Sequence, residues 1–295
     1  MSLSHLLADG AVKLYGMNRR GPRLRGGYRL LQAAGKILPK LHHYPVSFEE
    51  TGEFLADVDD PDTYWLLNAF LGDMDSSLRH LVDLASIALA PGDVVWDVGG
   101  SMGLFSSHMA HSRLQLKSVE LFEPNPSPFR VAKALLGTHP RVHLHPFGLG
   151  KEVATAELYF GIGSGGASFK SRPKGTSHHV TCRIENGDQL LEAGVITGAP
   201  SLIKIDVEGF EAEVLQGLGK TISISKPVIF FEILFLSDEV VLGLVPENYR
   251  IAFIRDSDGK LIDGLARGRQ AYAMDAIMAP RDSDFWNRVK SRFAV

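Results

Sequence analysis

The 295-residue sequence has a single cysteine, Cys182, so the chain has no second cysteine for an internal disulfide or a zinc-binding pair. It has no run of about 18 apolar residues, the length that a membrane-spanning helix needs. Residues 1–20 lack both a basic start and an uninterrupted apolar stretch, so they do not resemble a secretory signal. These features and the single cysteine, which agrees with a reducing compartment, lead us to expect a cytoplasmic protein. Its 45% hydrophobic residues predict a globular fold with a large core.

Acidic residues are scarce in residues 1–45, where Asp9 stands alone against eight Lys and Arg. This segment therefore carries a formal charge of +7, which leaves −10 for the rest of a chain whose total is −3. Such a segment suits an anionic partner, and residues 13–40 are candidates for peripheral contact with the inner face of a membrane. A solvated pair of basic helices is the alternative. We do not expect nucleic-acid binding, because neither interleaved aromatic residues nor a known binding motif accompanies the charge.

The spacing of a dinucleotide-binding turn is also missing. In VVWDVGGSMGLFSSHMA, residues 94–110, an apolar run and Asp97 lead into Gly99, Gly100 and Gly103. A strand, a glycine-rich turn and a helix together bring backbone N–H groups to a ligand. Dinucleotide sites place the glycines at i, i+2 and i+5, whereas these fall at i, i+1 and i+4. The pattern thus argues against a nicotinamide-dependent oxidoreductase, which remains an alternative.

The chain divides into two regions by pattern: a helical, basic extension over residues 1–75 and a Rossmann-like domain over residues 76–295. In the first we expect helices near 2–16 and 27–38 and a hairpin or loop over 46–60; a helix near 75–89 follows. From Val94 on, strands alternate with helices, which predicts right-handed βαβ units and a parallel sheet. The expected strands are 94–98, 117–122, 142–145, 201–205, 227–232, 250–254 and 272–278, and the expected helices are 103–111, 127–136, 209–217 and 283–292. Residues 151–185 interrupt this order with a mobile loop between two strands, either a lid over an anionic substrate or an inert connection.

Carboxylates end several of the predicted strands, at the edge where doubly wound sheets bind ligands. Glu123 follows Gly103 by 20 residues, the interval typical of a carboxylate that binds both ribose hydroxyls. Because the turn has no Lys or Arg, these carboxylates would repel a pyrophosphate, so a positively charged nucleoside such as S-adenosylmethionine fits better. Each has a structural alternative: Asp97 as a turn or capping residue, Glu123 as a solvated strand end, and Glu232 as half of an ion pair.

Three stretches together resemble the FkbM family of S-adenosylmethionine-dependent methyltransferases. They are VVWDVGGSMGLFSSHMA, VELFEPNP at 119–126 and, most specifically, LIKIDVEGFEAEVLQGL at 202–218. The resemblance covers about residues 92–234. It implies a class I methyltransferase fold, a doubly wound α/β architecture with a seven-stranded sheet of order 3-2-1-4-5-7-6 whose last strand is antiparallel. It also implies O-methylation of a sugar, polysaccharide or natural-product hydroxyl, on an acceptor that is anionic or lipid-linked if the basic segment binds it.

The resemblance assigns two sets of residues to the site. The cofactor-binding set is Asp97, Gly99, Gly100, Ser101 and Gly103 for the methionine end, Glu123 for the ribose, Phe122 or Asn125 near the adenine, and Asp206. The catalytic set is Asp206, Glu208 and Glu232. Asp206 or Glu208 is expected to take the hydroxyl proton if burial or like charges raise its pKa.

The chain departs from the family pattern at several positions. Gly100 and Ser101 stand where the family usually has Ala and Asn, and Glu185 or Asp188 replaces the aspartate of a Thr-Leu-Asp motif. Ile233 follows Glu232 where a histidine is often found. These departures keep open a non-catalytic module that retains the cofactor fold.

Other groups offer alternatives for the chemistry. His143 and His145, or His178 and His179, are alternative bases, unless they are exposed strand and loop residues. A divalent metal between Asp206 and Glu232 is conceivable, although we expect none.

Overall fold

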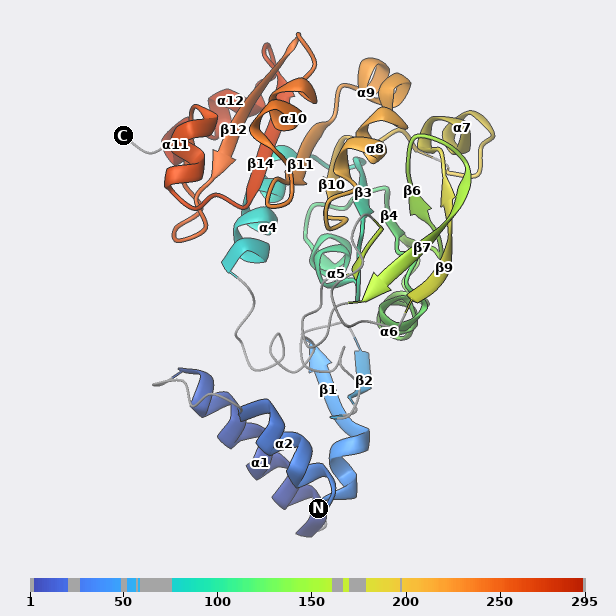
Figure 1. The fold of residues 1–295 in the computed structure, drawn as a ribbon, viewed down its shortest axis with the longest axis vertical. Helices are drawn as coiled ribbons and strands as arrows, with labels where there is room; N and C mark the ends of the chain where they lie inside the picture. The colour runs from blue at the N-terminus through green and yellow to red at the C-terminus, as the bar shows by residue number, and fades with distance from the viewer. Residues whose placement is uncertain are drawn as a thin grey trace. The chain divides into compact units, whose positions relative to one another are not determined.

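The computed structural model describes residues 3–20, 27–48, 52–56, 58, 76–160, 167–169, 179–196 and 198–293 (Figure 1). The chain forms two compact units, Met1–Asp75 and Ser76–Val295. Within the described residues, no helix is long and apolar enough to cross a membrane. That residues 1–75 are a basic extension to a Rossmann-like domain over residues 76–295 stays a prediction.

The first unit contains two helices, a 3₁₀ turn and a hairpin: α1 (Leu3–Arg20), α2 (Gly27–Gly35), η1 (Pro39–His43), β1 (Tyr44–Phe48) and β2 (Gly52–Ala56). Ala8, Val12 and Tyr15 recur at i, i+4 and i+7 on α1, and all three are buried. β1 and β2 pair antiparallel. The two predicted helices are thus confirmed for the described residues, and of the two alternatives for residues 46–60, a hairpin or a loop, the structure shows a hairpin.

The second unit is built on an eight-stranded sheet. In chain order its strands are β3 (Val94–Val98), β4 (Ser118–Phe122), β5 (Val142–His145), β10 (Leu202–Ile205), β11 (Val228–Glu232), β12 (Tyr249–Ile254), β13 (Leu261–Ile262) and β14 (Asp275–Pro280). The spatial order is β5-β4-β3-β10-β11-β14-β12-β13, and β14 runs antiparallel to both of its neighbours. This confirms the predicted order. The prediction of seven strands misses β13, which is too short for its pattern to be visible in the sequence.

Helices cover this sheet. Those that the sequence predicts are α4 (Ser76–Ala88), α5 (Leu104–His111), α6 (Pro126–Leu136), α8 (Glu211–Gln216) and α12 (Phe285–Arg288), the last followed by η2 (Lys290–Arg292). Four further helices are α7 (Gly187–Glu192), α9 (Gly219–Ser225), α10 (Asp238–Gly243) and α11 (Leu265–Gln270). They were not predicted, and each of them spans only six or seven residues, two turns or fewer.

The insertion after β5 forms a second, four-stranded sheet. Its strands are β6 (Gly148–Leu149), β7 (Ala154–Phe160), β8 (Ala167–Ser168) and β9 (His179–Glu185), in the order β6-β9-β7-β8. Figure 1 shows β6, β7 and β9 beside the β4 side of the main sheet, and the Cys182 thiol of β9 donates to the Pro124 carbonyl that follows β4 (3.2 Å). The strands flanking the predicted mobile loop are present, while residues 161–166 and 170–178 lie outside the described residues.

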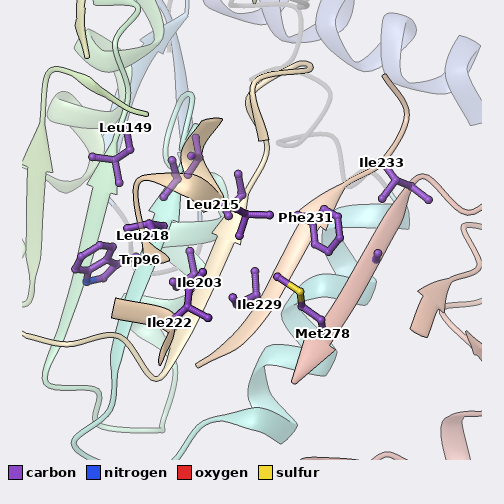
Figure 2. Close-up of a cluster of buried hydrophobic side chains, with 14 of the residues drawn as sticks. Trp96, Leu149, Ile203, Leu215, Leu218, Ile222, Ile229, Phe231, Ile233 and Met278 are labelled. Carbon is purple, nitrogen blue, oxygen red and sulfur yellow. The ribbon is translucent and has the colours of Figure 1, made fainter. Parts of the chain in front are cut away.

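One face of the main sheet is closed by apolar packing. Trp96, Ile203, Ile229 and Met278 lie directly opposite one another across β3, β10, β11 and β14. Leu215, Leu218 and Ile222, from α8, α9 and the link between them, lie over this row (Figure 2). Full burial of each such side chain stabilises the fold by about 1.5–3 kcal/mol. The candidate polar and charged side chains therefore lie on the opposite face of the sheet and at the carboxyl ends of its strands.

Candidate active site

The glycine turn after β3 is held against two neighbouring loops. The N–H groups of Gly99 and Gly100 both donate to the Phe122 carbonyl, at 3.0 and 3.1 Å. Gly99 has a φ of +75°, and a Cβ added there would lie 1.9 Å from the Asp206 carbonyl oxygen. Only glycine permits this backbone approach, so the turn after β3 and the loop after β10 come together because residue 99 has no side chain.

Glu123, at the end of β4, ties this turn to the start of α6. One carboxylate oxygen accepts the N–H of Ser101 (2.9 Å), a residue with a left-handed φ of 49°. The other accepts the N–H of Asn125 (2.7 Å). Burial raises the pKa of Glu123 to about 7, against the pull of these two N–H groups. Each oxygen keeps a lone pair that can accept a hydroxyl, so the carboxylate fits a ribose diol.

The two residues expected near an adenine have other roles in the structure. Phe122 is fully buried, and its ring stacks on His145 with centroids 4.7 Å apart. An adenine contact by this ring does not fit, because the β4 pleat turns it into the core cluster; its carbonyl instead holds the glycine turn. The Asn125 side chain caps α6 by accepting the Ser127 N–H (3.1 Å).

Asp97 lies beneath the turn rather than on a ligand-facing surface. Its side chain is fully buried and accepts a hydrogen bond from the Ser106 hydroxyl of α5 (2.7 Å). The Nζ of Lys204 is 3.4 Å from Asp97 Oδ1 and 3.3 Å from Asp206 Oδ2. Lys204 thus compensates two of the carboxylates, although the turn itself has no Lys or Arg, as the sequence shows. The cation comes from β10 and not from the turn, where the sequence analysis looked for it.

Three carboxylates gather where β10 and β11 end: Asp206, Glu208 and Glu232. Asp206 is almost half exposed, with 45% of its side-chain surface accessible. Burial, together with Asp206 and Glu211, raises the pKa of Glu208 to about 7. Burial and four neighbouring carboxylates raise the pKa of Glu232 to about 9. At neutral pH Glu208 can thus exchange a proton, whereas Glu232 is protonated and suits a hydrogen-bond donor rather than a base.

Glu211, the first residue of α8, shapes the loop that carries Glu208. It is 1% exposed, and its Oε1 accepts the N–H groups of Val207 (3.2 Å) and Gly209 (3.1 Å). Glu208 between them has a left-handed φ of 55°, an uncommon conformation for a residue with a side chain. The sequence analysis did not single out Glu211, although an acidic residue in the first turn of a helix that follows a glycine is a recognisable signal for such loop bonding.

The remaining candidates are engaged elsewhere. Asp188 accepts the N–H groups of Lys220 (2.9 Å) and Thr221 (2.8 Å) and so joins α7 to α9, and Glu185 pairs with Arg183 (2.6 Å). Neither residue needs a ligand to explain its position.

The histidines are paired with carboxylates. His143 and His145 lie 2.8 and 2.9 Å from the two oxygens of the buried Glu120, and His179 lies 3.7 Å from Glu157. His178 lies outside the described residues. Among the side chains that the structure describes, no cluster of three or more His, Cys, Asp or Glu is arranged to hold a metal ion.

Comparison with known proteins was made on both sequence and structure. Residues 97–263 match the model of the methyltransferase FkbM domain. The hexuronic acid methyltransferase AglP of Haloferax volcanii is 29% identical over 154 residues, which are 52% of this chain and 59% of that protein. This chain thus spans less than two thirds of that relative's length.

Among solved structures, methyltransferase FkbM from Methylobacillus flagellatus aligns over 86% of this chain and 60% of its own, with 15% identity and a TM-score of 0.42. TrmK of M. capricolum, solved with S-adenosylhomocysteine, aligns over 68% of each chain with 11% identity and a TM-score of 0.37.

Proposed function

The chain belongs to the FkbM methyltransferase family, and from this premise we propose that it transfers a methyl group from S-adenosylmethionine to a hydroxyl of a sugar or related natural product. The observation that carries the proposal is the placement of two carboxylates after β4 and β10, the strands on either side of β3. Glu123 fits a ribose diol, and Glu208 has a pKa of about 7, close to that of an efficient general base.

The cofactor supplies a methyl group activated on a positively charged sulfur. The residues that would hold it are Glu123 for the ribose and the turn over residues 99–103 for the methionine portion. Asp206 supports this assignment, because 45% of its side-chain surface is exposed and a negative side chain favours a nearby positive charge. The positive charge of Lys204 partly offsets the negative charges of Asp97 and Asp206, because its amine pairs with both carboxylates.

Glu208 is our candidate for the general base. It would accept the proton of the acceptor hydroxyl, and such a base typically contributes about 10²–10⁴-fold to the rate. Glu211 fixes the backbone on either side of Glu208 and is a positioning residue. Glu232, protonated at neutral pH, would donate a hydrogen bond to an acceptor oxygen.

An exposed aromatic side chain beside this loop suggests where the acceptor lies. Phe235 is 59% exposed, and its Cβ is 3.4 Å from the position that a Cβ on Gly209 would occupy. Leu234 beside it is 49% exposed. Carbohydrate rings have apolar C–H faces that pack on aromatic rings, so Phe235 would bind the ring while Glu208 meets a hydroxyl. The name of the Haloferax relative, a hexuronic acid methyltransferase, supports a sugar acceptor. An acidic group on that sugar would face away from the carboxylates.

The first experiment is calorimetric titration of the purified chain with S-adenosylhomocysteine and, in parallel, with NADH. We expect micromolar binding of the first alone. Binding of NADH alone would instead indicate an oxidoreductase. Methyl transfer is then measured with a radiolabelled methyl donor on glucuronides, neutral glucosides and N-acetylglucosaminides. Binding of S-adenosylhomocysteine without transfer to any of them would favour the non-catalytic alternative.

A further inference from the structure

Helix α1 of the first unit has two apolar sides, and one of them is open to solvent. Ala8, Val12 and Tyr15 form the buried side. Four leucines follow the other side of the helix at helical spacing and form what we call the leucine stripe: Leu3, Leu6, Leu7 and Leu14. Each of them is at least half exposed, and Leu14 is 69% exposed. A helix that buries one apolar side and exposes a second has a surface left for a partner.

The exposed apolar surface continues beyond α1. Leu30 in α2 is 68% exposed and Ile37, just after α2, is 80% exposed. Single exposed aliphatic residues are ordinary on protein surfaces, and Ile224 of the second unit is one of these. Six within residues 3–37, four of them on one side of one helix, form a pattern that needs another explanation.

The segment of the first unit that carries the leucine stripe is strongly basic, whereas residues 46–75 of the same unit contain acidic residues and no Lys or Arg. Lys13, Arg29, Lys36 and Lys40 are all exposed, and residues 1–45 carry a formal charge of +7. The single acidic residue of that segment, Asp9, hydrogen bonds to Tyr44. The leucine stripe therefore belongs to a helical segment that has several exposed cations and one acidic residue.

We propose that the helical part of the first unit, α1, α2 and η1, binds the surface of an anionic lipid bilayer, with the leucine stripe in the headgroup and acyl boundary and the basic residues at the lipid phosphates. A basic amphipathic helix with leucines on its apolar side is the usual element for such binding. Basic residues next to it add electrostatic attraction to anionic lipids. A second copy of the chain is disfavoured as the partner, because two segments of +7 repel each other. A nucleic acid offers phosphates but no apolar layer for the leucines.

Vesicle sedimentation with the whole chain tests the proposal. One set of vesicles contains phosphatidylcholine and phosphatidylglycerol at about three to one, and the other contains phosphatidylcholine alone. We expect binding to the anionic vesicles and at least roughly tenfold weaker binding to the neutral ones. Raising the salt concentration from about 0.1 to 0.5 M should weaken the binding, because the Debye length falls below about 10 Å.

Two pairs of substitutions separate the apolar and the charged contributions. Leu7→Gln with Leu14→Gln removes exposed leucines only, so the fold is retained, and binding should weaken about tenfold or more. Lys36→Glu with Lys40→Glu should abolish the preference for anionic vesicles. Ile224→Gln on the second unit is the matched control and should change nothing.

Three outcomes would overturn the proposal. The first is no sedimentation with either vesicle. The second is equal binding by the leucine variant and the parent chain. The third is concentration-dependent dimerisation that the leucine variant abolishes, which would assign the stripe to a second copy of the chain. None of these measurements depends on methyl transfer, so they leave the proposed enzymatic function untouched.

Discussion

Lys204 lies directly opposite Asp97 in the parallel register of β10 and β3, with 3.4 Å between Lys204 Nζ and Asp97 Oδ1. Burial by itself lowers the pKa of Lys204, but Asp206 and Asp97 outweigh it, so the net shift is upward and the amine stays charged. The pair joins two strands in the centre of the sheet. The Lys204 amine also connects the fully buried Asp97 to the half-exposed Asp206.

Replacing Lys204 by Met should destabilise the protein by about 3–5 kcal/mol, because it leaves the Asp97 carboxylate buried without its cation. Urea unfolding followed by circular dichroism measures the loss. Lys220→Met is the control, since Lys220 forms an exposed pair with Glu192 (2.7 Å) and should show no measurable change. A Lys204→Met variant as stable as the control would mean that the buried pair contributes nothing to stability.

Lys204 also shows what could be predicted from the sequence and what could not. Its apolar neighbours Leu202, Ile203 and Ile205 mark a fully buried strand, and that strand was predicted correctly. The partner of its amine depends on the register between β10 and β3, which are far apart in the chain, and period-2 patterns carry no information on that register. The sequence therefore predicts the strand but not the ion pair.

The carboxylates at the strand ends were predictable for a related reason. Glu123 and Asp206 each follow a short apolar run, so the sequence places them at the carboxyl edge of the sheet, and the structure has them there. Their charge states follow from burial and from neighbours brought in by other elements, such as Asp275 opposite Glu232 on β14. The Phe122 ring does not fit an adenine contact, because successive side chains of a strand point to opposite sides of the sheet and this ring lies on the core side.

Gly99→Ala should destabilise the protein and weaken binding of S-adenosylhomocysteine. The new methyl group would lie 1.9 Å from the Asp206 carbonyl oxygen, and the alanine backbone would have to adopt a φ of +75°. Gly92→Ala is a matched control, because Gly92 has a φ of +86° but open space around it. The control should lose about 1–3 kcal/mol from the backbone conformation alone. If thermal unfolding shows equal losses in both variants, the contact between the two loops is not what requires a glycine at residue 99.

Glu123→Gln should weaken binding of S-adenosylhomocysteine by about 10–100-fold, because hydrogen bonds to a charged acceptor contribute about 1.5–3 kcal/mol. The two oxygens of the Glu123 carboxylate accept the N–H groups of Ser101 and Asn125, whereas the glutamine amide has only one acceptor oxygen for them. In the parent chain, affinity should rise with pH through about 7 as Glu123 ionises. Calorimetry at several pH values measures both effects, with the exposed Glu247→Gln as control. Unchanged affinity in Glu123→Gln would refute the ribose assignment.

Phe235→Ala should raise the KM for the sugar acceptor several-fold and leave the affinity for S-adenosylhomocysteine unchanged. The reason is that Phe235 lies beside Gly209, at the loop that carries Glu208, and not at the glycine turn. Tyr272→Ala is the control, because Tyr272 is another aromatic side chain that is largely exposed, at 84%. Equal effects of the two substitutions on the acceptor KM would exclude Phe235 as the acceptor surface.

The rate of methyl transfer should rise with pH through about 7, because a general base works only when it has lost its proton and the pKa of Glu208 is about 7. At saturating S-adenosylmethionine, where the ionisation of Glu123 no longer limits cofactor binding, Glu208→Gln should abolish this rise and slow the reaction by about 10²–10⁴-fold. Glu239→Gln, an exposed carboxylate on α10, is the control and should leave the profile unchanged.

Asp206→Asn gives the sharper test of the same assignment. Asp206 raises the pKa of Glu208 through its negative charge, so removing that charge should move the rise in rate to lower pH. Asp206→Asn should also slow the transfer at pH values where the general base is fully ionised, because a negative group that favours the positive charge of the cofactor is lost. A rise in the parent chain near pH 9 would assign the base to Glu232, whose pKa is about 9. A shift of the Asp206→Asn profile toward higher pH would contradict both assignments, because every carboxylate of this cluster should titrate at lower pH once its negative neighbour is gone.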